Sequence, residues 1–195
     1  FNDYPNKYES WWGIKTLPAI NESNDDYVEF ITGKEGVLRH YIKLGISGWR
    51  LDVVDELPTP FVRKIREAVK NESSDAIIIG EVWEDATNKI SYGARRKFLL
   101  GNQLDSVMNY PLRDCIINFI NGYDGGFGFK STVITLAENY PKSVFYSLMN
   151  MISTHDTKRI LSVFGCENPP ENKSDRAVFR LSQKEMEIAT KKLFC

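Results

Sequence analysis

The stretch LGISGWRLDVVDELP, residues 44–58, reads as a buried strand, yet it carries an arginine and several acidic residues. Side chains alternate between the two faces of a strand, so Arg50 and Asp52 share one face, while Trp49 and Leu51 share the other. The second face is expected to pack on helices. Because buried charges must be paired or used, the first face predicts either an ion pair or a chemical site.

The composition is that of one ordinary globular domain, with 195 residues, 42% hydrophobic and 26% charged. A formal net charge of -1 argues against nucleic acid or an anionic membrane as a partner and favours a neutral one. No apolar run is long enough to span a membrane, and the start FNDYPNKYES lacks a signal-peptide pattern. The three cysteines have no CxxC spacing, which predicts no disulfide framework, no metal site and a cytoplasmic protein. A secreted protein whose signal peptide was removed fits the same pattern.

Strand and helix patterns alternate four times after an irregular first segment, residues 1–30. The predicted strands cover residues 46–54, 76–83, 104–110 and 144–154. The predicted helices cover residues 32–44 (capped by Thr32 and Glu35), 60–71, 111–120, 131–140 and 182–195 (capped by Ser182 and Glu185). Residues 86–103 read as loop and short helix, and residues 121–130 as a glycine-rich turn. This order predicts α/β architecture with a parallel sheet and a barrel-type site at the strand ends.

Two carboxylates follow two of these strands, Asp52 and Glu81, 29 residues apart. One βαβ unit has about this length, so both would lie at the same end of neighbouring parallel strands. A retaining glycosidase uses two carboxyl groups about 5 to 5.5 Å apart, one as nucleophile and one as proton donor. Arg50 would hold Asp52 ionised, and the apolar neighbours of Glu81 would favour its neutral, proton-donating form.

The segment STHDTKR supplies a third polar cluster, because His155 and Asp156 follow the last predicted strand. A histidine and a carboxylate at a strand end can bind sugar hydroxyls and stabilise an oxocarbenium-like transition state. Simpler readings remain open for each residue alone. Asp52 would then be a turn residue paired with Arg50, Glu81 a solvated loop carboxylate, and Asp156 a helix cap.

Together these stretches resemble the α-amylase superfamily of glycoside hydrolases. GWRLDVVDE is similar to the family's segment at the fourth barrel strand, which implies Asp52 as nucleophile and Arg50 as its orienting partner. GEVWEDA is similar to the fifth-strand segment and implies Glu81 as general acid/base. MISTHDTKR is similar to the seventh-strand segment, which implies Asp156 as transition-state stabiliser and His155 as a ligand of sugar hydroxyls. QLDSVMNYPL resembles the sixth-strand region.

Within that superfamily the stretches WWGIKTLPAIN and VMNYP resemble the neopullulanase and cyclomaltodextrinase branch. The resemblance implies further substrate-binding residues at Trp83, Glu84 and Arg159, and contacts to the leaving-group side by residues 53–56. Two positions depart from the branch pattern: Ser47 stands where an aspartate is usual, and Glu84 where many members have histidine.

The resemblance covers only part of a family member and implies a partial TIM (β/α)8 barrel, about strands 4 to 7 with their helices. Residues 1–30 would be the tail of the loop domain inserted after strand 3, and residues 31–195 the barrel fragment. The implied reaction is retaining hydrolysis of α-glucosidic bonds in maltodextrin, cyclodextrin or pullulan, with an α-glucan oligosaccharide as partner. The isolated fragment is expected to be inactive and to pair as a homodimer. No cofactor is expected in this part, whereas the full-length protein would carry calcium.

Two rival functions share these residues. A glucanotransferase or sugar isomerase of the same superfamily would use Asp52 and Glu81 on another acceptor. A noncatalytic carbohydrate-binding member would lack the carboxylates that are present here.

Overall fold

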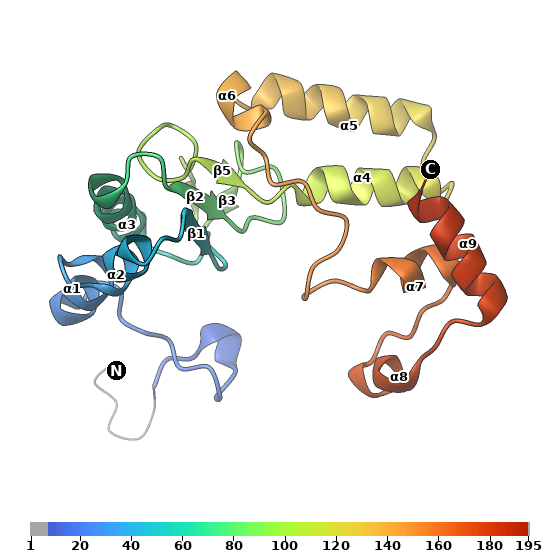
Figure 1. The fold of residues 1–195 in the computed structure, drawn as a ribbon, viewed down its shortest axis with the longest axis horizontal. Helices are drawn as coiled ribbons and strands as arrows, with labels where there is room; N and C mark the ends of the chain where they lie inside the picture. Colours follow the sequence, from blue (N-terminus) through green and yellow to red (C-terminus); the bar gives the residue numbers. More distant parts are fainter. Residues whose placement is uncertain (1–7, 195) are drawn as a thin grey trace. The chain divides into compact units, whose positions relative to one another are not determined.

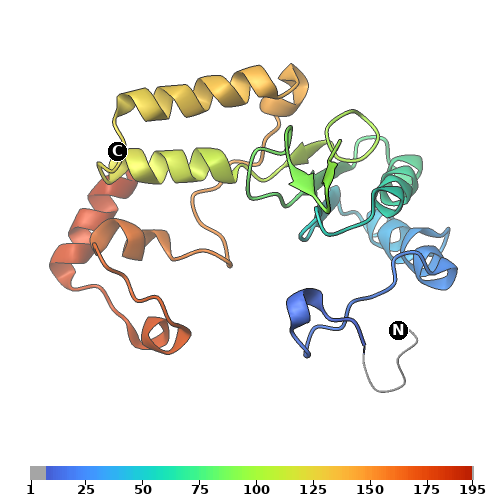
Figure 2. The same cartoon turned by 180° about the vertical axis from the view of Figure 1, so that it is seen from behind.

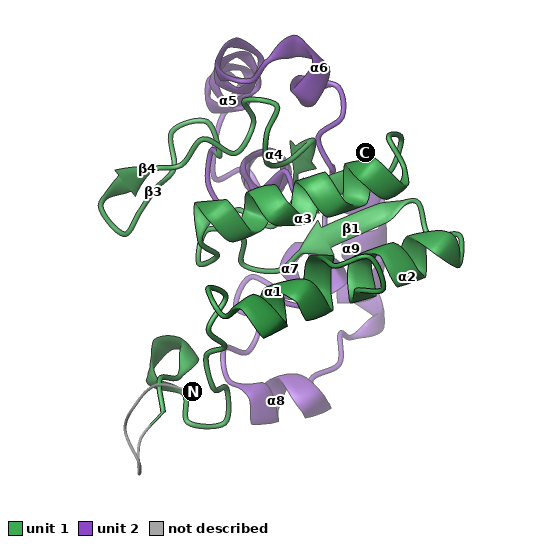
Figure 3. Ribbon diagram, turned by 90° about the vertical axis from the view of Figure 1, so that its left-hand side faces the viewer, with its two compact units in different colours: residues 1–82, 86–107 green, residues 83–85, 108–195 purple. Residues whose placement is uncertain are grey.

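The computed structural model describes residues 8–194, which form two compact units (Figure 3). Residues 1–82 and 86–107 belong to the first unit, and residues 83–85 and 108–195 to the second. Residues 1–7 of the predicted N-terminal segment, and Cys195, lie outside the described residues. The first unit contains η1 (Trp11–Gly13), α1 (Asp25–Thr32), α2 (Val37–Lys43), β1 (Gly48–Leu51), α3 (Thr59–Glu72), β2 (Ile77–Gly80), β3 (Ile90–Ser91), β4 (Ala94–Arg95) and β5 (Ser106–Val107).

The sheet of the first unit has three parallel strands in the order β1-β2-β5, which confirms the predicted parallel arrangement (Figure 1). β1 and β2 pair in register from Gly48 opposite Ile77 to Leu51 opposite Gly80. At Gly48 a Cβ atom would lie 2.2 Å from the carbonyl oxygen of Ile77, so this position needs glycine. The same register aligns the residues that follow the two strands.

Helix α3 buries the apolar face that its sequence predicts. Phe61, Val62, Ile65 and Val69 on this helix are buried. Helices α1, α2 and α3 also pack against one another. The observed bounds of α3, Thr59–Glu72, confirm the predicted helix 60–71 within one residue at each end.

The predicted helix 32–44 is confirmed only over α2, Val37–Lys43, and its predicted start with a capping box at Thr32 is wrong. Helix α1 already ends at Thr32, whose hydroxyl donates back to the Val28 carbonyl at 2.8 Å. Asn24 is the observed N-cap of α1, and its side chain accepts from the backbone N–H of Tyr27. A second helix, α2, then begins after Gly36. The glycines at the junction end one helix and begin another because they favour non-helical backbone.

Residues 86–103 contain a β-hairpin instead of the predicted loop and short helix. Strands β3 and β4 pair antiparallel around a two-residue turn, Tyr92–Gly93. Both turn residues have positive φ, 51° at Tyr92 and 72° at Gly93, as a type I′ turn requires. Asparagine or aspartate usually precedes glycine in such turns. Because tyrosine stands there instead, the sequence lacked the usual signal for a hairpin.

The second unit is helical. Its elements are α4 (Tyr110–Ile120), α5 (Gly126–Asn139), α6 (Lys142–Phe145), α7 (Ile160–Gly165), α8 (Lys173–Val178) and α9 (Gln183–Leu193). Helices α4 and α5 lie side by side, as the front and back views agree (Figure 1; Figure 2). A core of Ile117, Phe164 and Ala189 joins α4, α7 and α9. The predicted capping box of Ser182 and Glu185 at the start of α9 is confirmed.

Two predictions for this unit need correction. The expected strand 144–154 is reduced to one parallel bridge, Met149 to Met108, because its first residues belong to helix α6 after Pro141. Proline ends the preceding helix and leaves the following residues free to begin a new turn. The expected glycine-rich turn 121–130 is helical from Gly126 onward, since α5 begins there.

Asp105, which precedes β5, joins that strand to α3 and β2. Its carboxylate accepts from Arg66 at 2.8 Å and from the backbone N–H of Ile78 at 2.9 Å, and it lies 2.8 Å from Lys70 Nζ. Burial raises the pKa of Asp105, but the hydrogen bonds from Lys70, Arg66 and Ile78 outweigh it and hold the pKa below its ordinary value. The ionised carboxylate therefore stabilises the folded chain.

We expect Asp105→Asn to lower the free energy of unfolding by about 2 kcal/mol near pH 7, because charge-assisted hydrogen bonds are lost. The folded-state pKa is the lower one, so this stabilisation is present above the unfolded pKa of about 3.9 and is lost as pH falls further. Urea unfolding followed by tryptophan fluorescence at several pH values measures the difference. The exposed Asp75 supplies the matched control, Asp75→Asn. Equal urea midpoints for wild type and Asp105→Asn at pH 7 would contradict the prediction.

Two further features of the chain can be stated for residues 8–194 alone. In this part of the chain, no helix is long and apolar enough to cross a membrane. Cys115 and Cys166 are free thiols.

Candidate active site

The sheet register brings the two predicted carboxylates together. Leu51 lies opposite Gly80, and the N–H of Glu81 donates to the carbonyl of Leu51 at 2.9 Å. Asp52 and Glu81 are thus the next residues on two neighbouring parallel strands, whose backbones lie about 4.8 Å apart. The strand ends therefore present two carboxyl groups side by side.

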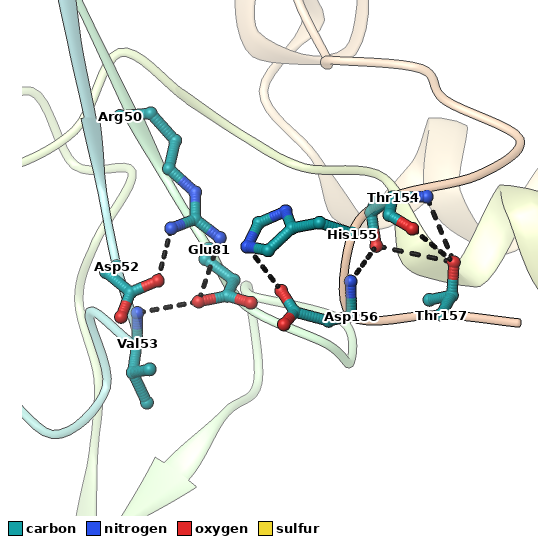
Figure 4. Close-up of polar contacts among 8 residues, drawn as sticks. All are labelled: Arg50, Asp52, Val53, Glu81, Thr154, His155, Asp156 and Thr157. Atoms are coloured by element: carbon teal, nitrogen blue, oxygen red, sulfur yellow. Dashed lines mark hydrogen bonds and ion pairs between the residues drawn. The ribbon is translucent and has the colours of Figure 1, made fainter. Parts of the chain in front are cut away.

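Arg50 joins the two carboxylates (Figure 4). Its Nη1 donates to Asp52 Oδ1, and its Nη2 lies 3.1 Å from Glu81 Oε2. The predicted sharing of one strand face by Arg50 and Asp52 is confirmed by this contact. Exposure differs sharply between the acids, since the Asp52 side chain is 73% exposed and the Glu81 side chain 4%. The Asp52 carboxylate is therefore accessible to a ligand, whereas the Glu81 side chain is buried.

The backbone of Val53 is a further part of this arrangement, and the sequence did not predict it. Its N–H donates to Glu81 Oε2 at 2.7 Å (Figure 4). The residue has a φ of 40°, which a β-branched side chain rarely adopts. This turn ends β1 and aims the N–H at the neighbouring strand's acid. Strained backbone of this kind gathers at functional sites.

The apolar surroundings expected for Glu81 are wrong. Glu81 is buried, but its Oε2 faces the guanidinium of Arg50 and the N–H of Val53. Neighbouring apolar residues in the sequence, such as Ile79 and Val82, misled the prediction because the contacts come from another strand. Side-chain surroundings of a strand residue are set by the adjacent strand rather than by its own neighbours.

His155 and Asp156 belong to the second unit, where a tight turn holds them. His155 Nε2 lies 3.0 Å from Asp156 Oδ2, and the N–H of Asp156 donates to Thr154 Oγ1 at 3.3 Å (Figure 4). The N–H of Thr154 in turn donates to Thr157 Oγ1 at 3.0 Å. Helix α7 begins at Ile160 with Arg159 as its N-cap, so Asp156 does not cap it. The helix-cap reading of Asp156 is therefore wrong.

The other predicted substrate-binding residues also belong to the second unit. Trp83 stacks on the buried Tyr110 with ring centroids 4.3 Å apart, and it remains 48% exposed. Glu84 and Arg159 are exposed. His155 and Arg159 line an open cavity of about 1050 Å³. In the first unit, Arg50 contacts both Asp52 and Glu81. In the second unit, His155 contacts Asp156. That the two groups form one site is a proposal.

Glu56, one of the residues 53–56 that the resemblance places on the leaving-group side, is a hydrogen-bonding centre in the structure. It accepts from the indole N–H of Trp12 at 3.4 Å and from the hydroxyl of Tyr92. The tight aromatic grouping of YESWW in the sequence is the one signal that could have indicated this role.

As for metals, no three side chains of His, Cys, Asp or Glu gather as a metal site within the described part of the chain. The calcium expected for the full-length protein stays a prediction.

Comparison with known proteins identifies the family to which this chain belongs. The model of the family described as "Alpha amylase, catalytic domain" matches residues 1–187. An amylopullulanase from Thermoanaerobacterium thermosulfurigenes is 33% identical over 94% of this chain and 11% of its own length. Neopullulanase 2 from Thermoactinomyces vulgaris is 33% identical over 78% of this chain and 24% of its own.

Among solved structures, the cyclic α-maltosyl-(1→6)-maltose hydrolase of Arthrobacter globiformis in complex with maltose has a TM-score of 0.71 at 30% identity. The match covers 80% of this chain and 33% of that one. The chain thus spans a third or less of the length of these three proteins. Its parallel strands and helices are part of a TIM barrel, and the chain belongs to the α-amylase catalytic-domain family.

Proposed function

We propose that this chain carries the nucleophile and the general acid/base of a retaining glycoside hydrolase that acts on α-glucosidic bonds of starch-type oligosaccharides. The observation that carries the proposal is the pair of carboxylates, Asp52 and Glu81, at adjacent ends of parallel strands and joined by Arg50. The names of the related amylopullulanase, neopullulanase and maltose hydrolase support an α-glucan as the substrate class.

The proposed reaction begins with attack of the exposed Asp52 carboxylate on the anomeric carbon, while Glu81 gives a proton to the leaving oxygen. A covalent glycosyl ester forms on Asp52, and water then hydrolyses it with Glu81 as base. The shared contact to Arg50 holds the two carboxyl groups close. This favours the spacing of about 5 to 5.5 Å of retaining enzymes over the about 6.5 to 9.5 Å of inverting ones.

The positive charge of Arg50 can balance the negative charge of the acid pair in both steps of the proposed reaction. The proposed reaction requires a carboxylate at Asp52 and a carboxylic acid at Glu81 before attack, which together carry one negative charge beside the Arg50 guanidinium that contacts both. After attack, Asp52 is a neutral ester, and Glu81, having given up its proton, carries the charge. Arg50 contacts both acids and balances the same total charge in each state. A fixed cation that needs no rearrangement during the reaction lowers the barrier.

We further propose that His155 and Asp156 join this site, with Asp156 stabilising the oxocarbenium-like charge and His155 binding sugar hydroxyls. Trp83, Glu84 and Arg159 would contact the substrate. In this proposal residues 31–195 supply barrel units 4 to 7, and residues 1–30 end the loop domain after strand 3. The parallel order β1-β2-β5 with the Met108–Met149 bridge supports four consecutive strands. The cytoplasmic setting and the homodimer stay predictions.

The test is to follow the first product from maltoheptaose by proton NMR, using the full-length protein that contains this chain. We expect the α-anomer to appear first, because two inversions at the anomeric carbon retain its configuration. Initial release of the β-anomer would contradict the retaining mechanism.

The isolated 195-residue chain in the same assay should release little or no product. Addition of excess glucose as acceptor separates hydrolysis from transfer, since a transferase would give chiefly longer oligosaccharides.

A further inference from the structure

Left-handed backbone at non-glycine residues occurs at three places within residues 8–194. These are Trp12, Val53 and Tyr92, with φ of 49°, 40° and 51°. Each is bulky or β-branched, and residues of these kinds occupy the left-handed region only at an energetic cost. Strain of this size persists where the surrounding structure imposes it, often for function.

All three strained residues contact Glu56. The N–H of Glu56 donates to the Val53 carbonyl at 2.9 Å. The Trp12 indole N–H donates to Glu56 Oε1 at 3.4 Å, and the Tyr92 hydroxyl donates to Oε2. One carboxylate thus joins two aromatic rings that are 80 residues apart in the sequence to the turn that follows β1.

Both rings are held in place and yet face solvent. The Tyr92 hairpin is fixed to residues 54–57, where Ser91 Oγ donates to the Asp55 carbonyl at 3.1 Å and Arg96 Nη2 to the Leu57 carbonyl at 2.6 Å. Trp12 stacks on Trp11 with ring centroids 4.5 Å apart and an interplanar angle of 10°. Nevertheless Trp12 is 73% exposed and Tyr92 77% exposed. Preorganised, exposed aromatic rings lose little entropy when a ligand binds.

We propose that Trp12 and Tyr92, with the Glu56 carboxylate between them, form a binding platform for a further glucosyl unit of the substrate chain. The inference rests on the proposed function and adds to it a subsite beyond the two catalytic carboxylates. Glu56 lies on the turn whose first residue, Val53, donates to Glu81, so the platform adjoins the reacting pair.

The chemistry of the platform selects a neutral sugar. The C–H face of a pyranose ring packs on an aromatic ring, and its hydroxyls donate to a carboxylate. The hydrogen bond to Glu56 raises the pKa of Tyr92, and burial and the negative charges of Glu56, Asp55 and Glu9 raise it further. These same charges repel phosphorylated or acidic sugars. A glucan chain is neutral and offers successive ring faces.

The experiment compares maltoheptaose with maltotriose as substrates of the full-length protein. Trp12→Ala and Tyr92→Asn should each lower kcat/KM for maltoheptaose relative to maltotriose by about tenfold, as expected for loss of one ring contact. The control is Phe127→Ala, which removes an aromatic ring that is 86% exposed in helix α5. This control should leave the ratio unchanged.

Tyr92→Asn also separates binding from folding. Asparagine before Gly93 is the residue that a type I′ turn prefers, so the melting temperature should be unchanged or higher while the maltoheptaose preference falls. A structural role for Tyr92 alone would lower the melting temperature and leave the substrate ratio intact. That pair of results would overturn the platform.

Failure of the platform differs from failure of the proposed function. If the wild type hydrolyses both sugars and the variants keep its substrate ratio, the platform is wrong and the reaction stands. If the wild type hydrolyses neither, the proposed function is wrong, and calorimetric titration with maltoheptaose then decides the platform. Weaker binding by Trp12→Ala than by the wild type supports it, whereas equal or undetectable binding overturns it.

Discussion

Asp52→Asn is expected to abolish hydrolysis of maltoheptaose by the full-length protein, with a loss of at least about 10³-fold in kcat. Such a loss corresponds to about 4 kcal/mol of transition-state stabilisation. An amide cannot attack the anomeric carbon as a carboxylate does, so no covalent ester forms. The effect should extend to nitrophenyl α-maltoside, because a better leaving group does not replace a missing nucleophile. Steady-state kinetics with both substrates measure it.

Asp75→Asn is the matched control for this change. Asp75 is exposed and precedes β2 at the opposite end of the sheet from Asp52. The same loss of charge there should leave kcat and KM near the wild-type values. Unchanged turnover in Asp52→Asn, with this control also active, would remove Asp52 from the catalytic role.

Glu81→Gln is expected to give the second large effect and a different signature. Loss of general acid/base catalysis should slow maltoheptaose hydrolysis by about 10² to 10⁴-fold. Formation of the glycosyl ester from nitrophenyl α-maltoside should fall much less, because nitrophenolate leaves without protonation. A burst of nitrophenol followed by slow turnover is then expected, since deglycosylation still needs the base. Rapid-mixing absorbance measures the burst.

The glutamine variant keeps an amide oxygen for the Val53 N–H, so it should stay folded. A melting temperature within a few degrees of wild type checks this. Equal losses on both substrates, with no burst, would contradict the acid/base assignment of Glu81 and leave that of Asp52 standing.

The local patterns of the sequence determined much of this fold. Helix α3, strand β2, helix α4 and the capping box of α9 follow the apolar periodicity and cap residues that predicted them. The buried apolar residues of α3 follow the period of 3.6 that predicted this helix, whereas β2 was indicated by a continuous apolar run. The 29-residue spacing of Asp52 and Glu81 likewise predicted one βαβ unit.

Other features could not be read from the sequence because distant residues decide them. The hairpin at residues 90–95 depends on contacts to residues 55–57, and these overcome the poor turn preference of Tyr92. The expected strand 144–154 failed because its apolar run fits a helix as well as a strand. In the structure, the residues after Pro141 form helix α6, which includes the first two residues of the expected strand.

For the candidate site, the sequence by itself predicted which residues would carry the chemistry: Arg50 lies in the first strand of a parallel α/β pattern, and Asp52 and Glu81 directly follow two of its strands. Only the tertiary structure decided their surroundings. Register set Asp52 beside Glu81, and one guanidinium and the Val53 N–H came to face the buried acid. The physical reason is that identity and spacing fix the type of group and the face it occupies, whereas its charge balance depends on atoms from a neighbouring strand.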